Sequence, residues 1–528
     1  MGKSKLIIFL TAFMVLLTFT STACGNNGDD TGGKEIVFPE KHVNFSFWDW
    51  QVATPSDARR LASLVKEMGY TGVDFTFRWT SIEYDKDEYY FDYVDDILDE
   101  FDKKDLFIST SLMFWSINIP WHEEIEWQKL SDGTIYDFSG RGASPSFSHA
   151  PTVEKMLNAF KAFATHINTR YEGRVTRIHA RTSQYGELEY FCGSGMLDYG
   201  QPAMDAFVEY LKDGYGTVSA LLEKTKVSKS FTSWETLSEA EPQELSELFY
   251  FDWQMFRQRE ALNLSALFDD ALEEINPDIP FALQVGSLWD AAAATLRGVF
   301  DPYLASKACD ILHTDDGPGF PHAFSIDLTS VTGGVEYASE IDGFWHPTIQ
   351  ALVNQGDKSL SPYVTQAREM GRSGIKYLNT ANWSLKEMQD YQTPLTSYVS
   401  QFLLAEERSP HDASIAILIN TVDFIYKARA MDALLLQTYN SLSENGTKKV
   451  RFVTDTQLIE NPQLLNGIQK LYIGTTYGEY CMREELITTL LASDTQLISN
   501  ESTAGIAFKN EYRINCDAAD VAQLKAKF

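Results

Sequence analysis

Cysteine is scarce in this sequence, with five residues in a chain of 528. No two of them form a C-x-x-C pair, and they lie far apart along the chain. Small domains held by disulfides carry many more cysteines per residue, and thiolate zinc sites need closely spaced ligands. The sequence therefore excludes a disulfide scaffold and argues against a zinc site built from cysteines.

Positive charge and phosphate-binding motifs are also lacking. Lys and Arg number 44 against 74 Asp and Glu, which gives a formal net charge of −30. Such a charge repels nucleic acid and anionic lipid, and we expect no nucleic-acid partner. Neither G-x-G-x-x-G nor a P-loop occurs, which argues against a nucleotide site. The absence of G-x-S-x-G argues against acyl transfer by a serine.

The N-terminus has the organisation of an export signal. Lys3 and Lys5 precede a 14-residue apolar run, residues 6–19, which is too short for a comfortable membrane span. Small residues then lead into Cys24, a pattern that resembles the lipobox of bacterial lipoproteins. We expect residues 1–23 to be a lipoprotein signal peptide, Cys24 to be acylated, and residues 24–41 to form a flexible tether.

These features predict an exported bacterial lipoprotein at the cell surface or in the periplasm. In this interpretation the lipid is the only membrane anchor, since no segment spans the bilayer. An ordinary cleaved signal followed by an unmodified cysteine is the alternative.

Between residues 42 and 408, short apolar segments alternate with segments of helical periodicity. Eight strands are expected, at residues 43–50, 72–79, 106–114, 175–187, 280–287, 309–314, 331–336 and 374–379. Eight such alternations predict a (β/α)8 TIM barrel. A doubly wound sheet is the alternative, but the first strand lacks the glycine-rich turn that such a sheet would need.

After residue 408 the alternation restarts with shorter strands and helices. This second pattern, over residues 409–528, predicts a smaller flavodoxin-like α/β domain. The fold class is therefore α/β, with a TIM barrel followed by a second α/β domain.

The active sites of such barrels lie at the carboxyl ends of the strands. Glu187 is expected to end the fourth strand and Glu336 the seventh. Two carboxyl groups facing across a cleft suit glycosidic cleavage, in which one protonates the leaving oxygen and the other attacks the anomeric carbon or activates water. Glu189 is the alternative to Glu187, and Glu340 the alternative to Glu336.

Aromatic and polar residues at the other strand ends are candidates for binding a sugar. The candidates for substrate binding are Trp48, Arg78, Trp115, Tyr337, Asn382 and Trp383. We expect no metal and no cofactor, while the group His313, Asp315 and Asp316 keeps metal catalysis open as an alternative.

With both carboxylates in place, the chain resembles the clan A glycoside hydrolases, which carry an acid/base Glu after strand four and a nucleophile Glu after strand seven. The order of barrel and flavodoxin-like domain resembles the family 42 β-galactosidases over about residues 42 to 500. Residues 144–171 and Trp383 are also family-like. The resemblance implies a retaining β-galactosidase-like enzyme that cleaves terminal β-linked sugars of an oligo- or polysaccharide. It also implies that Arg78 orients the nucleophile and keeps it ionised.

The same resemblance implies that the second domain is an amidotransferase-like module which forms a homo-oligomer, a trimer in that family. Cys481 follows a predicted strand of this module. It lacks the flanking glycines of a strained nucleophile turn, and the last histidine of the chain is His411. We therefore expect an oligomerisation module with no chemistry of its own.

Three departures from the family leave the substrate open. Gly186 stands where the family has an asparagine before the acid, about 90 residues separate strands four and five, and the usual small β-sandwich is missing. A sister family acting on β-mannosides or β-glucans is one alternative. The segment 186–190, GELEY, is similar to G-E-L-R-Y of the inverting β-amylases, which is a second. A surface glycan-binding protein without catalysis is a third.

Overall fold

The computed structural model describes residues 37–115, 121–137, 142–190, 195–331, 334–344, 346–427, 433–473, 479–480, 482–499, 507–508, 523 and 526–527. The described residues from Pro39 onward belong to one compact unit. The predicted signal peptide, Cys24 and Cys481 lie outside the described residues. Within the described part of the chain, no helix is both long and apolar enough to cross a membrane.

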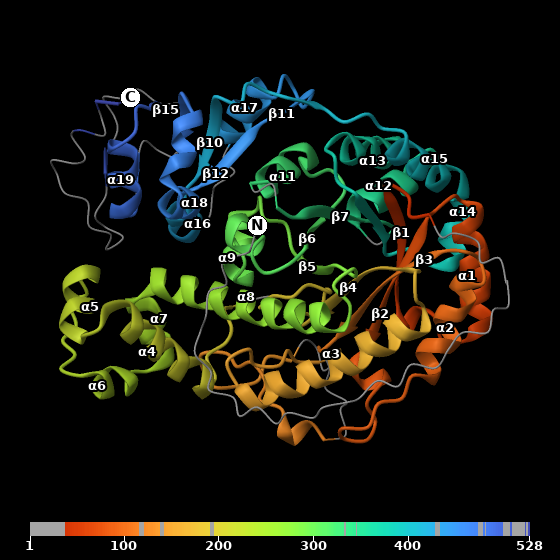
Figure 1. Ribbon diagram of the computed structural model, residues 1–528, viewed down its shortest axis with the longest axis horizontal. Helices are drawn as coiled ribbons and strands as arrows, with labels where there is room; N and C mark the ends of the chain where they lie inside the picture. Colours follow the sequence, from red (N-terminus) through yellow and green to blue (C-terminus); the bar gives the residue numbers. More distant parts are fainter. Residues whose placement is uncertain are drawn as a thin grey trace, which may run out of the picture. The chain divides into compact units, whose positions relative to one another are not determined.

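Eight parallel strands close into a barrel in chain order (Figure 1). They are β1 (His42–Trp48), β2 (Gly72–Arg78), β3 (Phe107–Met113), β4 (Val175–Arg181), β5 (Phe281–Val285), β6 (Ile311–Asp316), β7 (Glu336–Asp342) and β8 (Tyr377–Ala381). The pairing of β1 with β8, where Val43 lies opposite Leu378, closes the barrel. This confirms the predicted TIM barrel.

Helices surround the barrel and cover its outer face (Figure 1). The barrel helices are α1 (Pro55–Glu67), α2 (Asp92–Asp102), α3 (Ala150–Arg170), α8 (Tyr250–Ile275), α9 (Ala291–Arg297), α10 (Pro302–Ala305), α11 (His322–Thr329), α12 (Pro347–Asn354), α13 (Ser361–Arg372), α14 (Leu385–Asp390) and α15 (Gln392–Leu403). Local signals start several of them: Thr54 caps α1 by accepting from the Asp57 amide, with Pro55 in the first turn.

The barrel strands alternate between apolar and polar side chains. In β1, Phe45 and Phe47 belong to the large apolar core, while Asn44 and Ser46 are buried polar residues. Because successive side chains of a strand point to opposite faces, the apolar set packs under the helices and the polar set fills the barrel. Barrel interiors are usually dominated by branched aliphatic residues, so this interior is unusually polar.

A buried ion cluster lies inside the barrel around Asp74. Its carboxylate is 3.1 Å from Arg177 Nη2, 3.2 Å from Arg181 Nη2 and 3.4 Å from His179 Nε2. Burial alone would raise the pKa of Asp74, but His179 and the two arginines outweigh it and hold that pKa well below its usual range. The cluster therefore ties β2 to β4 through charge rather than through apolar packing.

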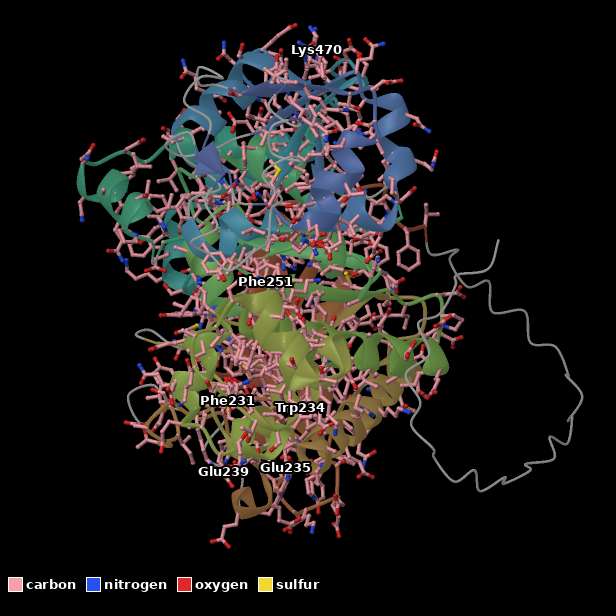
Figure 2. All side chains as sticks on the ribbon, turned by 90° about the vertical axis from the view of Figure 1, so that its left-hand side faces the viewer. Phe231, Trp234, Glu235, Glu239, Phe251 and Lys470 are labelled. Atoms are coloured by element: carbon pink, nitrogen blue, oxygen red, sulfur yellow. The ribbon has the colours of Figure 1, made fainter. Side chains whose placement is uncertain are left out.

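The long segment between β4 and β5 forms a helical insertion with its own apolar core. Its helices are α4 (Gln201–Tyr215), α5 (Val218–Thr225), α6 (Trp234–Ser238) and α7 (Pro242–Leu248), and Figure 2 labels Phe231 and Trp234 within it. The 26-residue helix α8 joins the two cores, since Trp253 packs in the insertion core and Phe268 in the barrel core.

A parallel four-stranded sheet follows the barrel. Its strands are β10 (Ile415–Ile419), β12 (Arg451–Thr454), β13 (Lys470–Ile473) and β15 (Gln496–Ser499), in the order β12-β10-β13-β15. Taken in chain order this is 2-1-3-4, the start of the flavodoxin-like order. Its helices are α16 (Thr421–Lys427), α17 (Ala433–Leu442), α18 (Asp455–Glu460) and α19 (Glu484–Leu491), and two-residue strands lie at β9 (Ser409–Pro410), β11 (Lys448–Lys449), β14 (Glu479–Tyr480) and β16 (Ala507–Phe508).

Arg408 joins this sheet to the barrel. Its guanidinium pairs with Asp327 of α11 at 2.6 Å, and both side chains are buried. The domain boundary at residue 409 stays a prediction, because the barrel and the sheet belong to one compact unit.

Candidate active site

The loop after β4 carries two buried glutamates. The strand ends at Arg181, so Glu187 lies in the loop and not, as predicted, at the end of the strand itself. Backbone hydrogen bonds fix the loop: the Leu188 amide donates to Gln284 O and the Tyr190 amide donates to Arg297 O, both at 2.9 Å. The loop is therefore held against the carboxyl end of β5 and the end of α9.

Glu187 and Glu189 share one cation. Arg297 Nη1 is 3.7 Å from Glu187 Oε1 and 3.3 Å from Glu189 Oε1, and each glutamate is 1% exposed. Ser183 Oγ donates to Glu187 at 2.7 Å, and the Gly286 amide donates to Glu189 at 3.1 Å.

Burial raises the pKa of Glu189 to about 8, against the opposing effect of Arg297 and with a further contribution from the charge of Glu187. A carboxyl group that keeps its proton at neutral pH is what a general acid requires. The post-β4 loop therefore offers an acid, held by this pair of glutamates.

The predicted position of the seventh strand is wrong. β7 begins at Glu336, where the prediction ended it, and runs to Asp342. Glu336 pairs with Ile311, the first residue of β6, and its carboxylate contacts Lys376 Nζ. Because active sites lie at the carboxyl ends of barrel strands, Glu336 is at the opposite end of the barrel from Glu187. The expected pair of Glu187 and Glu336 is therefore corrected.

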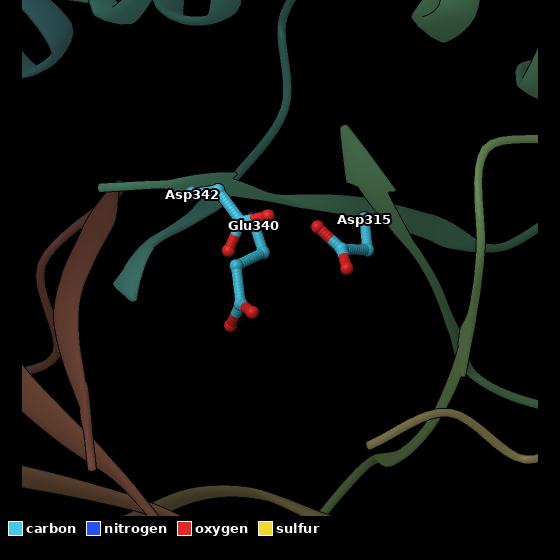
Figure 3. A group of neighbouring side chains, drawn as sticks. All are labelled: Asp315, Glu340 and Asp342. Atoms are coloured by element: carbon cyan, nitrogen blue, oxygen red, sulfur yellow. The ribbon is translucent and has the colours of Figure 1, made fainter. Parts of the chain in front are cut away.

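Glu340 and Asp342 take that place on β7. Both point into the barrel, with Asp315 of β6 beside them (Figure 3). Oxygen atoms of the three carboxyl groups lie within 4.8 Å of one another. Burial and the charge of Asp342 raise the pKa of Asp315. That spacing could also accommodate a divalent cation, while the expectation that the site needs no metal stays a prediction.

Glu340 is held by two neutral donors. Ser46 Oγ donates to its Oε2 at 3.0 Å and Asn379 Nδ2 donates to the same oxygen at 3.4 Å. Burial raises the pKa of Glu340 to about 7; Arg181 opposes this shift, and Asp342 adds to it. Glu340 is thus a fixed, buried carboxyl group between the ion cluster and the mouth of the barrel.

Asp342 links β7 to the post-β4 loop. Burial raises the pKa of Asp342, Asn382 and His346 lower it, and the charge of Glu187 raises it further. Glu187 also adds to the raised pKa of Asp315. The charged groups of the post-β4 loop and of β7 are therefore close enough to shift one another's pKa values.

Arg78 does not approach the carboxylates of β7. Its guanidinium pairs with Asp49 at 2.9 Å, and Ser81 donates to the same carboxylate oxygen. The predicted contact between Arg78 and Glu336 is therefore wrong, since Asp49 is a nearer partner and Glu336 lies elsewhere. Arg181 is the cation that lowers the pKa of Glu340.

Trp48 lies against the post-β4 loop, and its contact with a sugar stays a prediction. A Cβ atom at Gly186 would lie 2.9 Å from Trp48 Cη2 and 2.6 Å from Arg181 Nη1. Gly186 also has a φ of +104°, which favours glycine. The position has no room for the asparagine that the family carries there.

The remaining predicted sugar contacts divide between the site and the core. The Asn382 amide donates to Asp342, so Asn382 lies beside the carboxylates. Trp115 is half-buried against Gly142. Trp383 is 1% exposed, and its ring centroid lies 5.9 Å from that of Tyr363. Its use as a platform for a sugar ring stays a prediction.

Tyr337 was wrongly placed and two site residues were missed. Tyr337 is the second residue of β7 and lies near Glu336, away from the mouth. Asp342 lies two residues after Glu340, so the two-residue period of a strand would have placed them on one face. No sequence pattern pointed to Arg297, because it ends the short helix α9 and lies more than 100 residues after Glu187 in the chain.

The chain matches a known protein family. A family model described as β-galactosidase, of glycoside hydrolase family 42, matches residues 47–318, which are 272 of the 528 residues. No curated protein matches the sequence.

Solved structures share the fold. A β-galactosidase from the psychrophilic Marinomonas ef1 is 15% identical over 87% of this chain and 75% of its own, with a TM-score of 0.61. A family 42 β-galactosidase from G. stearothermophilus is 14% identical over 90% of this chain and 73% of its own, with a TM-score of 0.62. The catalytic domain of a β-amylase from Paenibacillus polymyxa is 13% identical over 69% of this chain and 97% of its own, with a TM-score of 0.52.

Proposed function

This chain belongs to glycoside hydrolase family 42 and is a glycosidase, and on that premise we propose that it hydrolyses terminal β-linked sugars, with β-galactosides as the first substrate class. The observation that carries the proposal is the juxtaposition of two buried glutamates beside Arg297, Glu187 and Glu189, with the carboxyl groups of β7. Oligo- or polysaccharides ending in such sugars are the expected substrates.

The proposed reaction is a double displacement with retention. The Glu340 carboxylate attacks the anomeric carbon, the bond from that carbon to the leaving oxygen breaks, and Glu187 gives its proton to that oxygen. In the second step Glu187 takes a proton from water, whose oxygen bonds to the anomeric carbon as the ester bond to Glu340 breaks. The enzyme returns to its starting protonation state.

Glu340 is preferred to Asp342 as the nucleophile because of how each is held. Ser46 and Asn379 fix one oxygen of Glu340 and leave the other available. The Asn382 amide binds Asp342 instead, at the end of β7. We propose that Asp342 and Asn382 bind sugar hydroxyl groups.

A panel of aryl β-glycosides tests this function. The β-galactoside should be hydrolysed fastest, with the β-glucoside and β-mannoside as comparisons for a sister-family specificity. Proton NMR of the first product formed should show the β-anomer. The absence of turnover on every aryl β-glycoside would remove the proposal.

An inverting, β-amylase-like reaction is the second candidate. It is supported by the GELEY segment at 186–190 and by the structural match to the β-amylase catalytic domain. Inversion needs the two carboxyl groups about 6.5–9.5 Å apart, with water between them. Release of β-maltose from an α-glucan, with no action on aryl β-glycosides, would favour this candidate.

Location and assembly are further proposals. We propose that Cys24 carries the lipid that anchors the exported protein, and that the C-terminal module forms a homo-oligomer. Labelling of the wild type with a radioactive fatty acid, and loss of the label in Cys24→Ala, would support the first. Light scattering of the purified protein tests the second.

A further inference from the structure

Gly286 leaves a space that the Arg297 guanidinium fills. A Cβ atom at position 286 would lie 1.7 Å from Arg297 Nη1 and 2.8 Å from its Cζ. The φ of Gly286 is outside the region that favours glycine, so the backbone there accepts other residues. The glycine is therefore needed for space, and what occupies that space is Arg297.

The backbone of Arg297 is also tied to the acid loop. Its carbonyl accepts from the Tyr190 amide at 2.9 Å. The next residue, Gly298, lies so close to Tyr190 that a Cβ atom there would be 2.7 Å from the ring. The end of α9 and the loop that carries Glu187 and Glu189 thus form one packed corner.

The charges at this corner do not balance without a proton. Arg297 faces Glu187 and Glu189, at 3.7 and 3.3 Å, and more distantly Asp315 and Asp290. Its side chain is 22% exposed, while those of the two glutamates are 1% exposed. One cation beside two buried carboxyl groups leaves one of them to be neutralised by a proton.

We propose that Arg297 is the positioning residue of the acid. Gly286 provides the space in which the Arg297 guanidinium lies beside Glu187 and Glu189, and the two glutamates then share one transferable proton. This rests on the proposed function, in which Glu187 protonates the leaving oxygen. In this proposal Arg297 neither transfers a proton nor bonds to the sugar. It acts by placing the two carboxyl groups and by favouring the ionised form of one of them.

The pH profile separates this role from a structural one. In a retaining enzyme the alkaline limb of kcat/KM reports the acid and the acidic limb reports the nucleophile. Arg297 opposes the raised pKa of Glu189, so its removal should raise that pKa further and move the alkaline limb to higher pH. Glu340 has different charged neighbours, Arg181, Asp342 and Asp74, so the acidic limb should stay in place.

Four variants test the proposal with an aryl β-galactoside as substrate. Arg297→Gln should move the alkaline limb up by about one pH unit or more, and Arg297→Lys should restore part of the shift. Gly286→Ala should move the same limb in the same direction, because its methyl group displaces the guanidinium. Gly334→Ala is the matched control, since a Cβ atom there meets nothing within 4 Å.

A readout without substrate keeps this test distinct from the test of function. The melting temperature of Arg297→Gln should fall more steeply than that of the wild type as pH rises from about 6 to about 9, because both buried glutamates lose their cation. A wild type without turnover would remove the proposed function, and this thermal test would still decide the role of Arg297. Folded Arg297→Gln and Gly286→Ala proteins with unmoved alkaline limbs and wild-type thermal slopes would overturn the inference.

Discussion

Glu340 and Asp342 lie two residues apart on β7 and direct both carboxyl groups to the inside of the barrel (Figure 3). Glu340 is bound by Ser46 and Asn379, while Asp342 is bound by Asn382. One strand thus supplies a deep, fixed carboxyl group and a second one at the mouth. In the proposed reaction this arrangement gives a different expectation for each residue.

Glu340→Ala and Glu187→Ala should fail in different ways. A nucleophile has no substitute, so Glu340→Ala should lose about 10⁴-fold or more of kcat on every substrate. Added azide should restore part of the turnover and give a product of inverted configuration. Glu187→Ala should keep part of its activity on aryl glycosides with acidic phenols, because these leaving groups need no proton.

Stopped assays with activated and natural substrates measure the difference, and circular dichroism checks the fold of each variant. Wild-type rates for Glu340→Ala together with an inactive Asp342→Ala would transfer the nucleophile to Asp342. Equal losses of Glu187→Ala on both kinds of substrate would make Glu189 the acid.

Glu336→Ala should behave as a surface variant. Glu336 lies at the start of β7 and contacts Lys376, and its side chain is 37% exposed. Exposed ion pairs contribute about 0–1 kcal/mol to stability. We expect kcat/KM on an aryl β-galactoside within about twofold of wild type. A large loss of kcat in a folded Glu336→Ala protein would return this residue to the site.

The barrel could be predicted from the sequence, while the residues that form its seventh strand could not. Apolar runs identified the strands whose outward faces carry aromatic or aliphatic side chains. In β1, for example, these side chains are Phe45 and Phe47. β7 carries Glu340 and Asp342 on its inner face, so its sequence does not resemble a buried strand. The more apolar residues before Glu336 were chosen instead, and the error follows directly from the polar interior of this barrel.

The sequence also did not predict which side chains from distant segments contact one another. Arg78 was correctly placed at the end of β2, but its choice of Asp49 depends on the turn after β1. The relation between Gly286 and Arg297 depends on how α9 packs on the end of β5, which no local pattern encodes. Glu187 was chosen because it follows the fourth strand and precedes Leu188 and Tyr190, and its role as the acid stays a prediction.

Glu189 should make the wild type lose stability as pH rises. Its pKa is raised to about 8 in the folded protein from a usual value of 4.5. Its contribution is therefore fully present below about pH 4.5 and lost as pH rises through about 8. Glu189→Gln removes this titration, so its melting temperature should fall less between pH 5 and pH 8 than that of the wild type. Parallel curves for the two proteins in differential scanning calorimetry would contradict the assignment.

Asp74 should be essential to stability rather than to chemistry. It lies inside the barrel with Arg177, Arg181 and His179 around it, and its side chain and that of Arg177 are fully buried. Asp74→Asn removes the charge that compensates the two arginines, and the loss of one partner from a buried ion pair costs about 3–5 kcal/mol. Urea denaturation should therefore show a lower midpoint for Asp74→Asn.

Asp390→Asn, which breaks an exposed pair with Lys386, is the matched control and should unfold like the wild type. A wild-type midpoint for Asp74→Asn would mean that the cations at the centre of the barrel find other partners, and the ion cluster would then no longer account for the joining of β2 to β4.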